Sequence, residues 1–288
     1  MPPAPTLRTV LVDWHLDPSM VLVIALLTIL YLLGVRRLAR RSIARRWPPT
    51  RTVAFLSGVA TVAVATQSGL ARYDTVLFSL HTLQHVLLGM LAPLLLALGA
   101  PVTLALQAAH RPTQRVLIRL LHNPLLSLLT HPLVAWVLFG GTLFALYFSP
   151  LLELSLRNGF VHQVVHLHFL TVGALFCWTA VGLDPVGHRI GHPVRLLFVL
   201  LAVPFHAFLG LAVLSSDARP LGGGFYEAVV RRWGPSVVSD QHAAAGVLWG
   251  FGDLFGVVAG AIVVVQWVKA DERRQVREDR ILDGEDRM

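Results

Sequence analysis

Between His81 and Pro101 the chain reads HTLQHVLLGMLAPLLLALGAP, a run in which two histidines and a glutamine interrupt an otherwise apolar sequence. The run overlaps a charge-free stretch that covers residues 76–98. The length of this stretch is close to the ~20 residues that an α-helix needs to cross the hydrocarbon core of a membrane. His81 and His85 are four residues apart and therefore share one face of such a helix. Because ionisable side chains are costly inside a membrane, the pair indicates a functional site in the interior of the protein.

Runs of comparable length recur along the chain. They cover residues 20–35, 53–70, 76–98, 124–148, 160–182, 196–214 and 243–268, and only the last contains a charged residue, Asp253. Of the 288 residues, 14% are charged, whereas soluble domains carry roughly 25%. We therefore predict an all-α, polytopic membrane helix bundle with about seven transmembrane helices over residues 20–268, preceded by a segment, 1–19, and followed by a charged tail, 269–288.

The basic residues predict how this bundle is oriented. Loops on alternate sides of a seven-helix bundle divide the 24 Lys and Arg residues into eighteen and six. Because Lys and Arg accumulate in cytoplasmic loops, we expect an extracytoplasmic N-terminus and a cytoplasmic C-terminus. The net charge of +8 then reflects orientation, so we expect no nucleic-acid partner. Arg231 and Arg232 fall on the side with fewer basic residues, where we expect them to contact the headgroups of the lipid bilayer.

A second histidine pair, His162 and His166, has the same four-residue spacing in the run 160–182. In the expected orientation both pairs lie within about three turns of the extracytoplasmic face, where the last run also begins. Histidines from three helices would thus occupy one layer, which a metal ion or a haem requires. The simpler alternative is that the imidazoles hold the helices together through hydrogen bonds. The residues that we predict as metal ligands are His81, His85, His162, His166, His242 and Asp240.

Three further residues are expected to support these ligands. Gln241 lies between Asp240 and His242, while His206 and Asp253 fall near the middle of the membrane, where a carboxylate needs a partner. We expect His206 and Asp253 to pair with each other, either as a structural contact or to support the site. His168 lies two residues beyond His166 and is expected to face elsewhere.

The residue types leave the identity of the metal open. Imidazole suits zinc, copper, iron and nickel. The chain has one cysteine, Cys177, and four methionines, so it does not encode a ladder of thioethers that would conduct Cu(I). Two alternatives to a protein that holds or relays a metal ion remain: electron transfer through a b-type haem held by histidines of facing helices, and a seven-span zinc hydrolase that uses three histidines, a metal-bound water and Asp240.

Four motifs together resemble one family. HTLQHVLLGMLAPLLLALGAP, HQVVHLHFLTVGALFCW followed by GLDP, FHAFLG, and SDQHAAAGVLWGFGD are similar, in this order, to the membrane family of cytochrome c oxidase assembly factors called CtaG, associated with caa-type oxidases. The resemblance implies a multi-span protein of the bacterial cytoplasmic membrane that is not an enzyme and helps to mature a haem-copper oxidase. It further implies copper as the metal, and oxidase subunits and an extracytoplasmic copper donor as partners.

Overall fold

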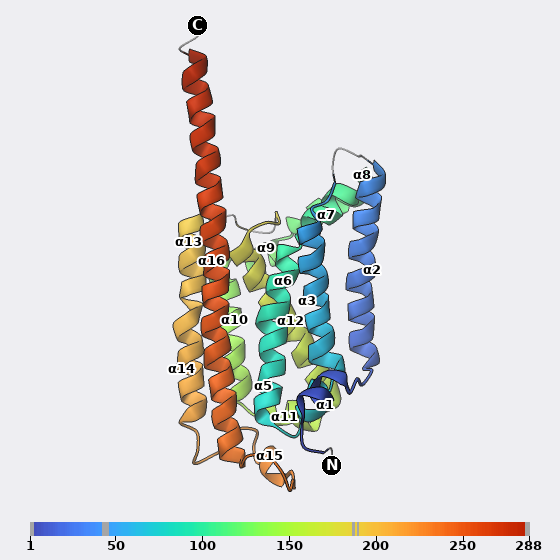
Figure 1. Cartoon of the computed structure of the whole chain (residues 1–288), viewed down its shortest axis with the longest axis vertical. Helices are drawn as coiled ribbons and strands as arrows, with labels where there is room; N and C mark the ends of the chain where they lie inside the picture. Colours follow the sequence, from blue (N-terminus) through green and yellow to red (C-terminus); the bar gives the residue numbers. More distant parts are fainter. Residues whose placement is uncertain (1–2, 42–45, 186–187, 189, 286–288) are drawn as a thin grey trace.

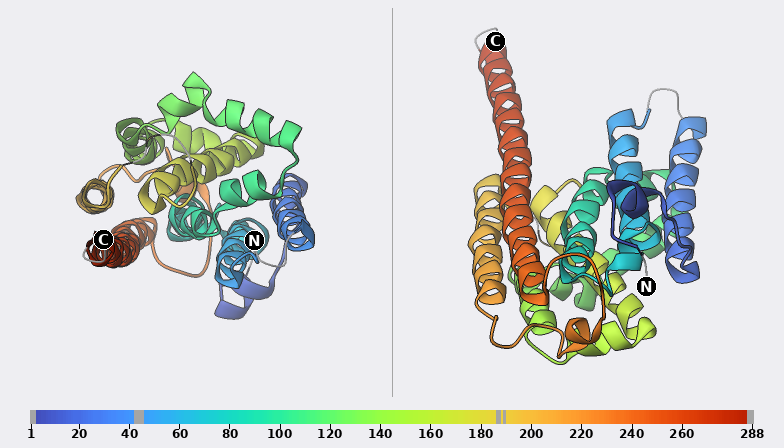
Figure 2. Two further views of the ribbon diagram at one scale, coloured as in Figure 1. Left: turned by 90° about the horizontal axis from the view of Figure 1, so that it is seen from above. Right: turned by 60° about the horizontal axis from the view of Figure 1, so that its bottom comes forward.

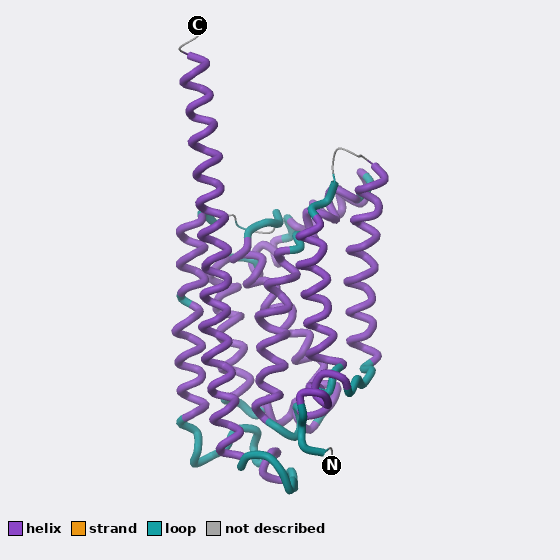
Figure 3. The backbone as a smooth tube through the Cα atoms, in the orientation of Figure 1, coloured by secondary structure: helices purple, strands orange, loops and turns teal. Residues whose placement is uncertain are grey.

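The computed structural model describes residues 3–41, 46–185, 188 and 190–285, and within these ranges the chain consists of helices and loops with no strand (Figures 1 and 3). Arg45, Arg189 and residues 286–288, which contribute to the charge pattern and the tail, lie outside the described residues. The all-α fold class is therefore confirmed for the described part of the chain.

Six stretches of helix are long and apolar enough to cross a membrane. The first three are α2 (Pro18–Arg41); α3 (Pro49–Gln67) with its continuation α4 (Leu70–Tyr73); and a long stretch made of α5 (Phe78–Val86), η1 (Leu87–Leu91), α6 (Ala92–Leu98) and α7 (Pro101–Ala108). The last three are α12 (Gly159–Val181); α13 (His192–Leu200) with α14 (Ala202–Leu214); and α16 (Val237–Glu285). A broken pair, α10 (Pro132–Tyr147) and α11 (Leu151–Arg157), bends by 71° and raises the number to seven if it counts as one span. The prediction of about seven membrane helices is confirmed at six to seven in the described residues.

The predicted fourth run, 124–148, is not one helix. It divides into α9 (Pro124–Leu129) and α10, because Pro132 begins the second helix and disfavours helical geometry at the residue before it. Before this run, the helix α8 (Arg111–Leu121) exposes all its residues at least in part. Hydropathy located the apolar run correctly, but the proline divides it.

The two described ends of the chain lie at opposite ends of the bundle (Figures 1 and 2). The short helices α1 (Leu7–Val12), α11 and α15 (Phe225–Ala228) gather at the lower end of Figure 1, while α16 projects far beyond the upper end. An odd number of crossings produces this arrangement. The helix α16 continues without a break past residue 268, so the predicted boundary of the charged tail is not a break in secondary structure.

Close backbone contacts fix how the central helices pack. A Cβ atom on Gly173 of α12 would lie 2.1 Å from the carbonyl oxygen of Gly89 in η1, so only glycine allows this approach. Gly252 and Gly256 of α16 instead leave room for side chains, those of His206 and Val203, whose nearest atoms would lie 2.4 Å and 2.1 Å from an added Cβ atom.

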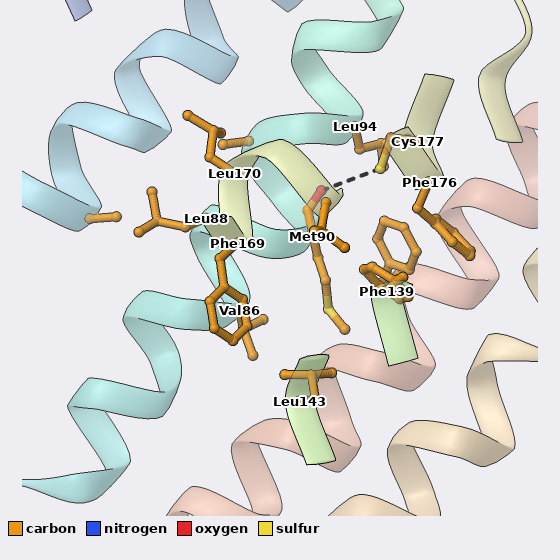
Figure 4. Close-up of a cluster of buried hydrophobic side chains, with 14 of the residues drawn as sticks. Val86, Leu88, Met90, Leu94, Phe139, Leu143, Phe169, Leu170, Phe176 and Cys177 are labelled. Carbon is orange, nitrogen blue, oxygen red and sulfur yellow. Dashed lines mark hydrogen bonds between the residues drawn. The ribbon is translucent and has the colours of Figure 1, made fainter. Parts of the chain in front are cut away.

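Between the helices that meet at Gly89 lies a cluster of buried apolar side chains. Figure 4 shows Met90, Phe139 and Phe176 around it, with Cys177 pointing at the Met90 carbonyl group. Cys177 is fully buried, as expected for a small apolar packing residue.

Candidate metal centre

Four histidines meet inside the bundle, near the end where α5 and α12 begin (Figure 1). His81 and His85 project from α5, and His162 and His166 project from α12. The ring centroids of the two pairs are 4.2 Å and 4.3 Å apart within a pair, and across the helices His81 lies 5.3 Å from His162 while His85 lies 5.8 Å from His166. The two histidine faces that the spacing predicts therefore point toward each other.

These imidazoles are buried, and several of their nitrogens have no hydrogen-bond partner among the residues that the structure describes. His81 and His85 have no exposed surface, and His162 and His166 are 8% and 3% exposed. The unpartnered nitrogens are both nitrogens of His81, Nε2 of His85, Nε2 of His162 and Nδ1 of His166. Because a buried polar atom without a partner is costly, a cluster of five such atoms is typical of a site that binds a ligand.

The distances between these atoms fit a metal ion. One ligand atom each from His81, His85 and His162 lies within 4.8 Å of the others, and a second set with the same spacing consists of Asp74, His162 and His166. Two nitrogens that bind one ion at about 2.1 Å can be no more than about 4.2 Å apart, so small side-chain shifts suffice. His162 belongs to both sets.

Gln84 determines which nitrogen of His166 is free. Its side-chain NH2 group donates to the carbonyl oxygen of Ala65 at 2.8 Å, so its Oε1 atom is the acceptor that faces Nε2 of His166 at 3.1 Å. Nε2 of His166 therefore carries the proton, and Nδ1 keeps its lone pair. Histidines that bind metals are commonly oriented by such a hydrogen bond from the other ring nitrogen.

Asp74 is a site residue that the sequence reasoning missed. It lies in the turn between α4 and α5, is 3% exposed, and brings Oδ2 to 3.7 Å from Nε2 of His162. Burial raises the pKa of its carboxyl group to about 7. A nearby cation would favour the ionised form. The available signal was an acidic residue two positions before the charge-free run 76–98.

The helix that carries His81 and His85 widens directly after them. The five residues of η1 have π-helical geometry, which is rare and often found at functional sites. This segment contains Gly89, whose carbonyl group contacts Gly173. The irregularity therefore lies where the two histidine-bearing helices approach each other most closely.

Asp240 and Gln241 are close to the cluster but bind the backbone instead. The Asp240 carboxylate accepts hydrogen bonds from the Phe78 amide at 2.6 Å and the Ser79 hydroxyl at 2.5 Å, and so caps the start of α5. Gln241 accepts from the Leu221 amide and donates to the Val213 carbonyl. The prediction of Asp240 as a ligand does not fit this geometry, because its oxygens already satisfy the first turn of the helix.

His242 does not join the other histidines. It is exposed, and its Nε2 atom lies 2.7 Å from Oδ1 of Asp217. Asp240 and Gln241 of α16 are buried, and the next position along the helix, His242, faces away from the bundle interior. The sequence prediction did not take this rotation around the helix into account. His168 also faces away, as expected, and its Nε2 atom lies 3.0 Å from the Thr142 hydroxyl.

His206 and Asp253 are near enough to interact electrostatically, but among the described residues no hydrogen bond or ion pair joins them. Nδ1 of His206 lies 2.8 Å from the Ala202 carbonyl oxygen, and its Nε2 atom has no hydrogen-bond partner. Asp253 is half-buried. His206 bonds within its own helix, so it needs no carboxylate to satisfy Nδ1.

Comparison with known proteins now identifies the family. Residues 29–270 match the family model described as cytochrome c oxidase caa3 assembly factor (Caa3_CtaG). The chain belongs to this family. The resemblance inferred from the four motifs is thereby confirmed, and the protein is a multi-pass membrane protein.

Relatives of this caa3 assembly factor family member occur in mycobacteria. The uncharacterized proteins Mb0105 of Mycobacterium bovis and MT0111 of Mycobacterium tuberculosis are each 35% identical to it over 292 residues, and ML1998 of Mycobacterium leprae is 32% identical over 291 residues. Each alignment covers 99% of this chain and 44% of the relative. The chain thus spans less than half the length of these curated relatives. No solved structure matches it.

One of the four motifs of this caa3 assembly factor family member has a structural role at the other end of the bundle. The Asp184 carboxylate of GLDP accepts hydrogen bonds from the amides of Val102 and Thr103 and from the Trp178 indole at 2.9 Å. It caps α7 and ties that helix to α12. Asp184 and the four histidines all lie within the matched residues, but five imidazole nitrogens of the histidines have no hydrogen-bond partner among the described residues.

Proposed function

We propose that this protein binds copper at His81, His85, His162 and His166 and makes it available to a cytochrome c oxidase during assembly. The observation that carries the proposal is the set of five buried imidazole nitrogens, from two helices, that have no hydrogen-bond partner. The family supplies the context, since its description is that of an assembly factor for caa3-type oxidase. In this proposal copper is a cargo, and the protein makes or breaks no bond in a substrate.

The arrangement favours a small ion over a haem. The imidazole rings lie side by side, with centroids between 4.2 Å and 6.4 Å apart. A haem macrocycle bound between two imidazoles needs a flat gap between them that is wide enough for its ring. A single ion needs only nitrogen lone pairs that point toward one position. Imidazole nitrogens are suitable copper ligands.

Two overlapping sets of ligand atoms also suit a protein that releases its metal. His162 belongs to the set with His81 and His85 and to the set with Asp74 and His166. An ion can therefore exchange one set for the other while His162 stays bound. A complete and rigid coordination shell would slow the transfer of the ion to another protein, and such a site does not need one.

The proposal also fixes where the exchange takes place. The histidines lie near the end of the bundle that holds the N-terminus, which the charge pattern predicts to be extracytoplasmic. The copper donor would then be extracytoplasmic, the acceptor would be an oxidase subunit in the same membrane, and the membrane would be the cytoplasmic one.

Copper analysis of the purified protein tests the proposal. After loading with Cu(I) and desalting, we expect the wild type and His168→Ala to retain the same amount of copper, and a variant with all four cluster histidines changed to alanine to lose it. His168 is the matched control because it lies on α12 but binds Thr142 outside the cluster. Equal copper content in the fourfold variant would refute the proposal.

Two further measurements separate the alternatives. A reduced-minus-oxidised visible spectrum with sharp bands would favour the b-type haem. Retention of zinc in preference to copper would favour the hydrolase, with Asp74 rather than Asp240 as the nearby carboxylate. In cells, an oxidase assembled beside the fourfold variant should lack copper while its haem content is kept.

A further inference from the structure

A groove at the surface shares one residue, Tyr147, with the surroundings of the histidine cluster. It has a volume of about 680 Å³ and lies between the break that joins α10 to α11 and the segment that precedes α15. Its lining includes Ser149 and Glu153 on one side, Ala218 and Gly222 on the other, and Tyr147. Glu153 and Arg219 both line it and have opposite charges, so the lining has no excess of one charge from these two residues.

Tyr147 connects this groove with the cluster. It is the last residue of α10, is 2% exposed, and lines the groove, while its hydroxyl group lies 3.5 Å from Nδ1 of His85. A single side chain therefore separates the groove from a cluster imidazole. Residues at the ends of helices commonly serve as hinges for the opening of a site.

A second, much smaller cavity of about 10 Å³ is lined by His85 itself, whereas the groove is not. It lies against the apolar cluster of Figure 4 and is lined by side chains such as Met90, Phe139 and Leu143. Apart from His85 and Thr142 its lining is apolar, so a metal ion that entered there would lose its hydration and gain few ligands, which is costly. Near the start of α5, Tyr226 packs on Phe78 and donates its hydroxyl hydrogen to the Asp74 carbonyl oxygen at 2.9 Å.

We propose that this groove is the route by which a copper ion reaches and leaves the histidine cluster, and that Tyr147 is its gate. The inference rests on the proposed function. When the Tyr147 side chain turns away from His85, the imidazole meets the groove directly. The path of the ion then passes the Tyr147 hydroxyl group and the Glu153 carboxylate, which also accepts a hydrogen bond from the Arg157 guanidinium group at 2.8 Å.

Blocking the groove tests the route. The native thiol of Cys177 is fully buried, so a cysteine introduced on the surface is the one that a bulky maleimide labels. Ala218→Cys places the label in the groove. Val230→Cys, at a residue that is 82% exposed and outside the groove lining, is the matched control. Both labelled proteins receive Cu(I) from its bicinchoninate complex, and the loss of colour gives the rate of loading.

We expect labelled Ala218→Cys to load roughly tenfold more slowly than labelled Val230→Cys and to reach the same final copper content. A second variant, Tyr147→Ala, should load faster than the wild type. Equal rates for the two labelled proteins would overturn the route while leaving the copper site intact. A lower final content at an unchanged rate would also overturn it. If the unlabelled wild type takes up no copper, the proposed function fails and the route with it.

Discussion

At the scale of single residues, Gln84 shows how a neutral side chain prepares an imidazole for a metal. Its amide group is held by the Ala65 carbonyl, so its oxygen atom faces His166 and fixes the proton on Nε2. Nδ1 of His166 is then left with a lone pair and no partner. A metal ion can therefore bind at Nδ1 of His166 without the free-energy cost of moving the proton to the other ring nitrogen.

We therefore expect Gln84→Leu to weaken copper binding by about 10- to 100-fold, the usual effect of removing a residue that orients a histidine ligand. The leucine leaves Nε2 of His166 buried without an acceptor, and the ring is free to turn. Competition with a Cu(I) chelator of known affinity measures the Kd.

Gln163→Leu is the control for this prediction. Gln163 lies on the same helix as His166, but its amide group donates to the Asp17 carboxylate at 2.6 Å and not to an imidazole. Its loss should leave the copper affinity unchanged. An equal loss of affinity in both variants would mean that Gln84 supports the fold and does not orient His166.

The sequence predicts some residues of this site and not others, and the difference has physical reasons. A four-residue spacing places His81 with His85, and His162 with His166, on helix faces, and the cost of burying them predicts that the faces turn inward. It does not reveal that Asp74 folds back from a turn, because that depends on tertiary packing. It also fails for Asp240, since a carboxylate that caps a helix and one that binds a metal look alike in a sequence.

At the scale of the elements, the contact between η1 and α12 holds the two histidine pairs in register. The carbonyl group of Gly89 occupies the space that any side chain at Gly173 would need. The same widened segment follows His85 directly. We therefore expect this backbone contact to help set the separation of the two helix axes and the distances among the imidazoles.

Gly173→Ala should separate these helices. Its Cβ atom would lie 2.1 Å from the Gly89 carbonyl oxygen, and forcing an extra carbon atom into a packed interior costs roughly 1–3 kcal/mol. We expect a lower Tm in detergent and a weaker affinity for Cu(I). Thermal unfolding and chelator competition on the same preparation measure the two effects.

Gly246→Ala is the matched substitution in a membrane helix. A Cβ atom at Gly246 of α16 meets nothing within 4 Å, and alanine favours helix over glycine. Its Tm should stay the same or rise, and its copper affinity should not change. If Gly173→Ala behaves like Gly246→Ala, the contact with Gly89 does not set the geometry of the site.

At the scale of the whole molecule, the bundle has two different ends. The histidine cluster, the groove and the short helices α1, α11 and α15 share one end, and the extension of α16 leaves the other (Figure 1). The charge-free runs predict the helices well, because the hydrocarbon core demands long apolar segments. They predict the breaks at Pro132 and between α10 and α11 poorly, because packing against neighbouring helices stabilises an interrupted span.

The orientation of these ends in the membrane is the remaining prediction. Eighteen of the 24 Lys and Arg residues fall in the loops and tail assigned to the cytoplasm, and this asymmetry should place the histidine end outside. Since the native thiol of Cys177 is buried, single cysteines report the sidedness. In spheroplasts, a membrane-impermeant maleimide should label Val230→Cys at once and should label Glu278→Cys, exposed on α16, only after the membrane is permeabilised. The reverse pattern would place the cluster on the cytoplasmic side, and copper would then have to come from a cytoplasmic donor.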